Sequence, residues 1–519
     1  MKEDLSLEKV IQADWIAKWA LYSPDKIAIK EFESGRTLSY RQLNNLGEHL
    51  AHYFTQQFDL KAGDRVAILA ENSLAHVALF CAAQKANFTL VPLNYRLAIG
   101  EIEYLLNDAS PTLLLAEKSF REALETSVAT KDIRHHWPWE ALADFCNQQK
   151  NHPPKDFPTP SIDENDPIFI LYTSGTTGFP KGALYTHKML LWNSINTAIS
   201  LIVNTESRTL NCLPFFHTGG WNVLLTPFLH HGAYTCLLKK FDAKTVLQLL
   251  ATEEATLFMG VPTMLKMIAA EEIFSNTPLA SLYYIIVGGE PMPIPLIERW
   301  HQKGVPIRQG YGMTEVGPNL TSLHQDDAIR KKGSIGRPNF YVQTKIVNEN
   351  GESVSPQIPG ELWLRGPMTT PGYWANPTAS QAALTDGWFK TGDRVIQDDE
   401  GFLYIIDRIK NMFISGGENV YPAEVERILV RHPAISEVVI IGVAHEKWGE
   451  VGKAFIVLNR DMTLNETAIL SYCEDKLARF KIPKHFVFLA ELPKNDTGKI
   501  NRKALPQGSG IVDSNFEKP

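Results

Sequence analysis

The chain has little of several features that would place it in a specialised class of protein. Its five cysteines (Cys81, Cys146, Cys212, Cys236 and Cys473) are scattered and form no C-x-x-C pair. This predicts neither a disulfide framework nor a zinc site, and it fits a reducing cytoplasm. No run of 18 apolar residues is present, so no transmembrane helix is expected. A net charge of −7 without a basic, aromatic-interleaved stripe argues against a nucleic-acid partner.

The composition is that of an ordinary globular protein, and the length predicts more than one domain. Hydrophobic residues make up 44% and charged residues 21% of the chain, as in most globular proteins. Its 519 residues are more than a single hydrophobic core usually accommodates. Apolar strand patterns alternate with helical patterns over about 1–150 and again over 166–320, on either side of a proline-containing connector. This alternation predicts an α/β fold with two doubly wound sheets. Short strands without helices over about 333–406 predict a small β-barrel-like unit, and 411–519 a compact α+β unit.

The most informative stretch follows the apolar run 168–171. Residues 172–182 read YTSGTTGFPKG and contain three glycines, four hydroxyl residues besides the tyrosine, and Lys181. Glycines allow the backbone to approach a ligand closely, and hydroxyls, N–H groups and a lysine suit phosphate oxygens. The spacing is not that of the G-x-x-x-x-G-K-[ST] loop. Taken alone, a run of serine, threonine and glycine is more often a polar surface loop.

Five further segments along the chain carry distinctive combinations of glycine, hydroxyl, charged and aromatic residues. They are 214–220 (PFFHTGG), 310–315 (GYGMTE), 390–393 (KTGD), 407–426 (DRIKNMFISGGENVYPAEVE) and 493–499 (PKNDTGK). Together the six segments resemble the signature of the adenylate-forming superfamily, which includes acyl-CoA synthetases, adenylation domains and firefly luciferases. The resemblance extends from about Trp15 to Lys503. A single segment could arise by chance, but six in order do not.

The resemblance implies a set of site residues. Those assigned to ATP phosphates are Thr173, Ser174, Gly175, Thr176, Thr177, Gly178 and Lys181. Those assigned to adenine are Gly288, Gly289, Glu290, Tyr311, Gly312 and Met313. Asp393 is expected at the ribose, Arg408 at the ribose or α-phosphate, Thr314 at the α-phosphate, and Glu315 as the Mg²⁺ ligand. Lys499 is expected between the carboxylate and the α-phosphate, and His217 in the acyl pocket near the thiol entry, while Gly416 and Gly417 line the pantetheine tunnel.

Each of these residues also has an ordinary structural explanation when it is considered alone. Lys499 would then be a solvated surface lysine, Glu315 a carboxylate at a helix start, and Asp393 a turn residue. His217 would be a structural histidine. Only the combination of motifs favours the functional assignment.

The chemistry that the resemblance implies has two steps. A carboxylate attacks the α-phosphorus of ATP and displaces pyrophosphate, and a thiol then displaces AMP from the acyl-adenylate. Members of the superfamily rotate a small C-terminal domain between the steps. This implies a large N-terminal domain over 1–409, a mobile lid over 411–519, and a hinge at Lys410.

We therefore predict an ATP-dependent acyl-CoA synthetase that uses ATP, Mg²⁺ and coenzyme A, located in the cytoplasm. A medium- to long-chain fatty acid is the expected substrate, held near Trp221, Val261 and Gly312. The alternatives are an aryl ligase of the 4-coumarate type and a stand-alone adenylation protein that loads a carrier protein. A non-catalytic nucleotide sensor is disfavoured by the presence of Lys499, Glu315 and Asp393. Peripheral membrane contact and the oligomeric state are left open.

Overall fold

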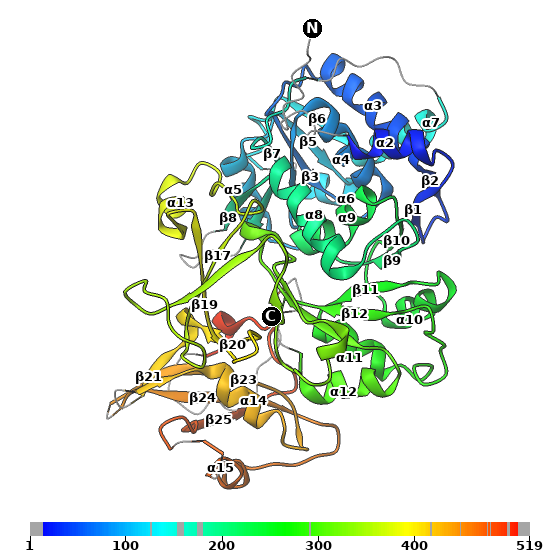
Figure 1. Ribbon diagram of the computed structural model, residues 1–519. Helices are drawn as coiled ribbons and strands as arrows, with labels where there is room; N and C mark the ends of the chain where they lie inside the picture. The colour runs from blue at the N-terminus through cyan, green and yellow to red at the C-terminus, as the bar shows by residue number, and fades with distance from the viewer. Residues whose placement is uncertain are drawn as a thin grey trace.

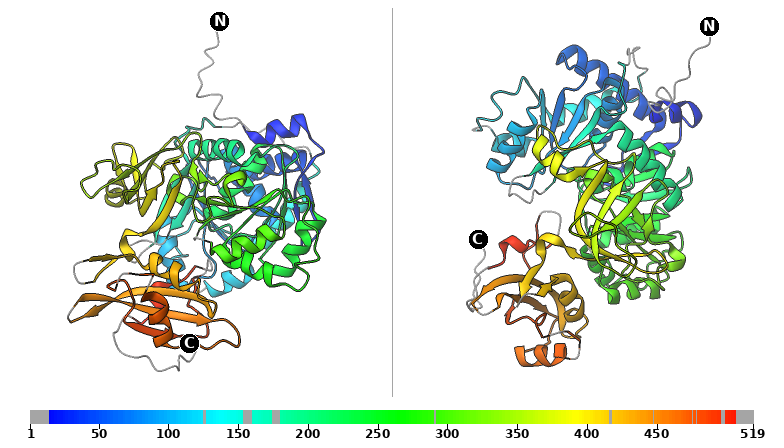
Figure 2. Two further views of the ribbon diagram at one scale, coloured as in Figure 1. Left: turned by 60° about the horizontal axis from the view of Figure 1, so that its bottom comes forward. Right: turned by 60° about the vertical axis from the view of Figure 1, so that its left-hand side comes forward.

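The computed structural model describes residues 14–124, 127–152, 160–173, 180–289, 292–415, 418–446, 448–474, 476–477, 479–495 and 499–506. Figure 1 shows a large body that contains the first four sheets, and a smaller C-terminal unit below it. The two views in Figure 2 show the same separation. The fold is α/β, as the sequence predicted. The assigned glycine-rich residues 174–178, together with Glu290, Gly416 and Gly417, lie outside the described residues.

The first large sheet has six strands in the order β6-β5-β3-β4-β7-β8, and all neighbours are parallel except β7 and β8. Its strands are β3 (Arg65–Leu69), β4 (Thr89–Pro92), β5 (Leu113–Ala116), β6 (His135–Pro138), β7 (Pro167–Thr173) and β8 (Lys181–Thr186). The accompanying helices are α3 (Tyr40–Gln57), α4 (Leu74–Ala86), α5 (Ile99–Ala109), α6 (Lys118–Ala123), α7 (Trp139–Gln149) and α8 (His187–Leu201). Every residue of α4 is buried, which explains why its sequence is apolar on all faces.

A second sheet joins the N-terminal hairpin to strands from the middle of the chain, in the order β2-β1-β10-β9. Its elements are α2 (Trp15–Tyr22), β1 (Ile27–Glu31), β2 (Thr37–Ser39), β9 (Arg208–Asn211), the π-helical turn η1 (Gly219–Val223), α9 (Leu225–His230) and β10 (Tyr234–Leu237). The hairpin leads directly into α3, where Ser39 and Gln42 form a capping box. Because β7 and β8 complete the first sheet and β1 completes the second, both sheets combine chain from either side of the connector near 147–166.

The third sheet, β11-β12-β13-β14-β15, changes character along its width. Strands β11 (Leu257–Gly260), β12 (Tyr284–Val287) and β13 (Ile307–Tyr311) are parallel, whereas β14 (Thr321–Ser322) and β15 (Arg337–Pro338) are antiparallel additions. Helices α10 (Ala243–Thr252), α11 (Pro262–Ala270) and α12 (Ile294–Gln302) accompany them, and the short turns η2 (Thr314–Val316) and η3 (Gln325–Asp327) follow β13 and β14.

The fourth sheet is antiparallel, as the sequence predicted for this region. It contains β16 (Gln343–Val347), β17 (Gly360–Arg365), β18 (Leu384–Thr385), β19 (Trp388–Gln397) and β20 (Leu403–Arg408), with α13 (Pro377–Ala383) before β18. Burial alternates along β19, which indicates one face on the core and one toward the surface.

The C-terminal unit is an α+β unit with its own sheet, β22-β21-β24-β23, and with β25 beside β24. Its elements are η4 (Ile409–Asn411), β21 (Phe413–Ser415), β22 (Glu418–Val420), α14 (Pro422–Leu429), β23 (Ile435–His445), β24 (Gly449–Leu458), α15 (Glu466–Glu474), β25 (His485–Phe488) and η5 (Arg502–Ala504). The domain boundaries and the hinge at Lys410 stay predictions.

Polar contacts join this unit to the large body. Asp407, at the end of β20, accepts hydrogen bonds from Asn411 Nδ2 (3.1 Å) and from the backbone N–H of Ala423 in the first turn of α14 (2.8 Å). We call this arrangement the Asp407 clasp. On the other side, Lys266 Nζ in α11 donates to Ser436 Oγ at 3.0 Å. The clasp therefore connects the chain before Lys410 with a helix that follows it.

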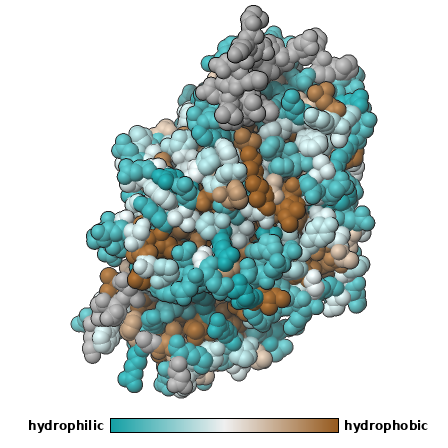
Figure 3. Space-filling view, in the orientation of Figure 1, coloured by the Kyte–Doolittle hydropathy of each residue, from teal (hydrophilic) through white to brown (hydrophobic). Residues whose placement is uncertain are grey.

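Most of the surface visible in Figure 3 is hydrophilic, and apolar side chains gather in a few separate groups. In the described part of the chain, none of the helices combines the length and apolar character required to span a membrane.

Candidate active site

Three chain segments that are far apart in sequence converge on Glu315. Strand β13 ends at Tyr311, and the turn η2 then places Glu315 in a buried position. Its Oε1 atom accepts hydrogen bonds from Tyr373 Oη (2.9 Å) and from Thr173 Oγ1 at the end of β7 (3.4 Å). Thr173 is paired with Lys181 across the β7–β8 ladder, and Lys181 Nζ lies 5.4 Å from the centre of the Tyr373 ring. The two ends of the glycine-rich loop are thus held next to Glu315.

Sequence reasoning missed the residue at the centre of this cluster, Tyr373. The backbone around it is fixed on both sides: Thr370 N donates to Glu315 O and Trp374 N to Gly182 O, both at 2.7 Å. The signal was present in the sequence, because Gly372-Tyr373-Trp374 places two aromatic residues after a glycine in a region of short strands. Burial and the neighbouring Glu315 carboxylate raise the pKa of Tyr373, so its hydroxyl remains a donor.

A second cluster contains the residues assigned to the nucleoside. Asp393 in β19 and Arg408 in β20 are direct cross-strand partners, with 3.0 Å between Arg408 Nε and Asp393 Oδ1. Tyr311 Oη donates to the other carboxylate oxygen at 2.6 Å. Asp393 is buried and Arg408 is exposed. An ionised carboxylate has about four acceptor positions, so Asp393 keeps capacity for hydroxyls of a ligand.

Lys499 of the C-terminal unit reaches the large body near Gly289 and His217. A Cβ atom built on Gly289 would be in ordinary contact with Lys499 Cε (3.4 Å) and Val261 Cγ1 (3.7 Å), whereas the backbone φ of +88° favours glycine at this position. Burial, together with the positive charges of Lys499 and Arg96, lowers the pKa of His217 to about 3. His217 is therefore neutral at physiological pH. Lys499 is joined to Asn495 by two hydrogen bonds: Asn495 N donates to Lys499 O at 2.7 Å, and Lys499 N donates to Asn495 Oδ1 at 2.9 Å.

Glycine is also required at position 312. A Cβ there would lie 1.9 Å from the carbonyl oxygen of Pro318, which no side chain could tolerate. The neighbouring Met313 places its sulfur 4.0 Å from Tyr311 Oη, and Thr314 opens the turn that carries Glu315. Gly288 lies at the end of β12, one residue before Gly289.

The structure corrects the expected acyl pocket at Trp221. Trp221 is fully buried in the hydrophobic core, stacks on Phe215 with 4.4 Å between ring centres, and donates its indole N–H to Phe215 O at 2.7 Å. It cannot contact a substrate there. Pro318 lies where a Cβ on Gly312 would stand, and Val261 lies close to Lys499 and Gly289; the pocket roles of Gly312 and Val261 stay predictions. Periodicity alone could not distinguish a core tryptophan from one in a pocket.

The cluster around Glu315 fits a magnesium ion bound together with ATP. Magnesium usually takes one or two carboxylates along with phosphate oxygens and waters. Both hydrogen bonds to Glu315 fall on Oε1, an arrangement that orients the carboxylate and directs Oε2 toward other partners. Thr173 and Lys181, which frame the glycine-rich loop, are on the same side as the Glu315 carboxylate.

These features define a nucleotide-dependent enzyme in which a small C-terminal unit delivers a lysine to the site. The chain belongs to the AMP-binding enzyme family: residues 16–374 match that family and residues 424–499 match its C-terminal domain.

Its relatives include CoA ligases for different acids. The indoleacetate–CoA ligase of Aromatoleum aromaticum is 39% identical over 95% of this chain and 97% of its own length. A long-chain-fatty-acid–CoA ligase of Mycobacterium tuberculosis is 34% identical over 94% of this chain and 96% of its own. The o-succinylbenzoate coenzyme A synthetase of Bacillus subtilis, solved with ATP and a magnesium ion, superposes with a TM-score of 0.83 at 31% identity, covering 95% of this chain and 99% of that one.

Proposed function

We propose that this protein is an acid–thiol ligase that joins a carboxylic acid to coenzyme A through an acyl-adenylate. ATP, Mg²⁺ and coenzyme A are its cofactors and co-substrates. The observation that carries the proposal is the position of Lys499, which the C-terminal unit places beside Gly289 and His217 in the large body. A cation there suits a reaction in which a carboxylate approaches a polyphosphate, because both reactants are anionic.

Each residue cluster has a role in the first half-reaction. Thr173 and Lys181, with the loop residues 174–178 between them, hold the β- and γ-phosphates. Asp393 binds the ribose hydroxyls, Tyr311 and the Gly288–Gly289 edge flank adenine, and Thr314 and Arg408 bind near the α-phosphate. Lys499 holds the attacking carboxylate oxygen close to the α-phosphorus. A bound magnesium ion would supply positive charge to the phosphates at Glu315.

The second half-reaction transfers the acyl group. The thiol sulfur forms a bond to the acyl carbon, the bond from that carbon to the AMP oxygen breaks, and the thiol proton is released to solvent. Lys499 occupies the space next to the site, so the C-terminal unit rotates about Lys410 before the thiol enters. Gly416 and Gly417 then line the tunnel for the pantetheine arm, next to His217.

Two classes of carboxylic acid are candidates for the substrate. The overall resemblance favours a medium- to long-chain fatty acid, and the 34% identical long-chain ligase supports that choice. The aromatic alternative is supported by the indoleacetate ligase, which is 39% identical over nearly the whole chain. On that difference we favour an arylalkanoic acid. CoA-dependent AMP release, measured separately with decanoate and with indoleacetate, would decide between the two classes of acid. The preferred acid has the higher kcat/KM.

The activity is tested by separating the half-reactions of the Lys499→Ala variant. The rate of acyl-AMP formation, measured by pyrophosphate exchange, should fall by about 10²–10³-fold, which is the usual effect of losing one preorganised donor. Thioester formation from supplied acyl-AMP should largely survive. Equal losses in both half-reactions would contradict the assigned role. Acyl transfer to a phosphopantetheinylated carrier protein, but not to free coenzyme A, would favour the carrier-loading alternative.

A further inference from the structure

A cavity of about 300 Å³ lies on the face of β13 opposite to Tyr311. We call it the back pocket. It is lined by Ile199 and Ile202 from the end of α8, Arg308 from β13, and His324, Arg337 and Phe340 from the segments around β14 and β15. The described residues of the site around Glu315 and Lys499 contribute nothing to this lining. Its volume is at the lower end of the range for small-molecule sites.

The floor of the back pocket contains a buried arginine with a spare donor. Arg308 is 2% exposed; its Nε donates to Leu323 O and its Nη2 to Ser200 O, both at 2.8 Å. The guanidinium lies over the Tyr284 ring at 4.4 Å. Among the described residues, Nη1 finds no hydrogen-bond partner although it is buried. Burying an unpaired donor is costly, so an acceptor brought by a ligand would compensate for it.

The rim of the back pocket carries exposed apolar side chains at positions where polar residues or glycine would cost less stability. Ile202 ends α8 in the left-handed region (φ +53°) and is 61% exposed. That conformation is strained for a β-branched residue, and glycine or asparagine is usual at this point of a helix. Phe340, on the opposite chain segment, is 74% exposed. Two large apolar side chains are therefore held in solvent beside a cationic floor.

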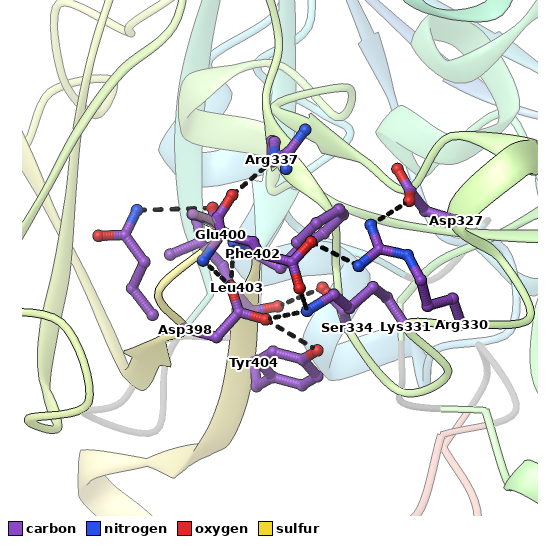
Figure 4. Close-up of polar contacts among 12 residues, drawn as sticks. Asp327, Arg330, Lys331, Ser334, Arg337, Asp398, Glu400, Phe402, Leu403 and Tyr404 are labelled. Carbon is purple, nitrogen blue, oxygen red and sulfur yellow. Dashed lines mark hydrogen bonds and ion pairs between the residues drawn. The ribbon is translucent and has the colours of Figure 1, made fainter.

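Other charges around the back pocket also favour an anion. Arg337 stacks on Phe402 at 4.0 Å and donates through Nε to the backbone oxygen of Glu400 (Figure 4). His324 interacts with Asp326 outside the lining. The acidic residue in the lining, Asp327, is paired with Arg330. The lining thus presents two arginines against one neutralised carboxylate.

From this geometry we propose that the back pocket binds a small amphipathic monocarboxylate. Its carboxylate accepts hydrogen bonds from Arg308 and Arg337, and its apolar part covers Ile202 and Phe340. An aliphatic or aromatic acid satisfies both requirements, whereas inorganic phosphate satisfies only the first. The site is distinct from the site around Glu315, and binding to it does not depend on the proposed reaction.

The back pocket is connected to the nucleotide cluster through β13. Arg308 and Tyr311 belong to the same five-residue strand and face opposite sides of it, and Tyr311 donates to Asp393.

Calorimetry of the full-length protein tests the proposal, with the active site first saturated by a non-hydrolysable sulfamoyl analogue of an acyl-adenylate. Decanoate, phenylacetate and inorganic phosphate are titrated separately. We expect one equivalent of at least one acid to bind and phosphate to bind more weakly. No binding of either acid to the blocked protein would overturn the proposal. Phosphate binding as tightly as the acids would overturn the amphipathic class.

Ile202→Gly provides a variant whose two effects have opposite signs. Relief of the backbone strain should raise the thermal midpoint by about 2 °C, while the lost apolar rim should weaken acid binding by about tenfold. A merely structural role for Ile202 would not produce both effects. Ile358→Gly removes an isoleucine that is also exposed but lies outside the lining, and it should leave binding unchanged. Unaltered affinity in both Ile202→Gly and Arg308→Gln would contradict the proposal.

Discussion

Among single residues, Tyr373 is notable because it contacts the glutamate that is proposed to bind magnesium. Its hydroxyl and that of Thr173 share one oxygen of Glu315, which fixes the rotation of the carboxylate. Groups that orient a metal-binding carboxylate often matter almost as much as the carboxylate itself. The proposed binding of Mg·ATP therefore depends on a tyrosine from a distant part of the chain.

The substitution Tyr373→Phe tests this dependence directly. We expect the affinity for Mg·ATP to fall by roughly tenfold, since loss of an orienting partner commonly has this effect. Binding of ATP in the presence of EDTA should change little. Calorimetric titration of the same preparation with both forms of the nucleotide gives the comparison.

Tyr234→Phe is the matched control for this experiment. Tyr234 also donates its hydroxyl to a glutamate, Glu253, at 2.7 Å, but in the second sheet and away from the site. It should affect stability without affecting the difference between the two forms of ATP. If both variants weaken Mg·ATP equally, the effect is structural and Tyr373 does not orient Glu315.

Sequence reasoning identified residues better where a motif is continuous than where a site is assembled from distant segments. Glu315 follows β13 within a single motif, and the structure brings it next to Thr173 and Lys181. Tyr373 contributes through a contact over 58 residues, which no local pattern encodes. Trp221 was misplaced because an apolar run looks the same in a core and in a pocket.

At the scale of elements, the turn between β19 and β20 is held by a network of ion pairs, drawn in Figure 4. Lys331 Nζ lies 2.7 Å from Asp398 and 2.6 Å from Glu400, and Arg330 also pairs with Glu400. Opposite charges raise the pKa of Lys331 and lower that of Asp398. The network anchors the start of β20, the strand that ends at Asp407 and Arg408.

Removing the central cation should therefore disturb a site that it does not touch. Lys331→Met is expected to lower the thermal midpoint by about 2 °C. It should also raise the apparent KM for ATP, because the strand β20 that positions Arg408 is then held less rigidly. The neighbouring Lys332→Met breaks an exposed pair with Glu298 and should do neither. Thermal unfolding and ATP kinetics of both variants provide the check. Similar behaviour of the two would show that the network does not support β20.

The short turn η4 between β20 and β21 carries the predicted hinge residue, Lys410. The proposed rotation of the C-terminal unit would require the backbone dihedrals to change at Lys410, and proline fixes φ near −65°. Lys410→Pro should retain pyrophosphate exchange but lose most CoA-dependent turnover, whereas Lys410→Ala should stay close to wild type in both. Wild-type thioester formation by the proline variant would exclude Lys410 as the hinge.

The type of each element, helix or strand, was easier to predict than which strands pair with one another. The hairpin β1–β2 and helix α3 follow local patterns, a period of two and a capped amphipathic face. The pairing of β1 with β10 joins residues about 200 positions apart, and the antiparallel pairing of β8 departs from the expected parallel order. The two-residue strands β14 and β15 are too short to show any periodicity.

For the whole molecule, buried histidines predict a loss of stability in mild acid. Burial lowers the pKa of His76 and of His230 to about 3, and that of His187 to about 4. Between these values and the ordinary value near 6.5, the unfolded chain binds protons that the folded chain does not. Stability therefore rises with pH across this window and is fully present above it.

His76 offers a test, because it is 1% exposed and packs against Trp139 and Phe215. At pH 5 its burial as a neutral ring should cost about 2 kcal/mol relative to pH 8. Urea unfolding of wild type and His76→Leu at both pH values measures this. The variant should lose less stability on acidification than wild type, and an equal loss in both would contradict the assignment.

The Asp407 clasp has a consequence for the timing of catalysis. It joins the two sides of Lys410 while Lys499 lies close to Gly289, which is the arrangement expected for the proposed ATP-consuming step. The proposed rotation about Lys410 would have to break the hydrogen bond from Ala423 before the thiol could enter. We therefore expect an ordered sequence in which coenzyme A adds last. The acyl-adenylate would then form while the clasp is intact, and it would react with the thiol only after the clasp has opened.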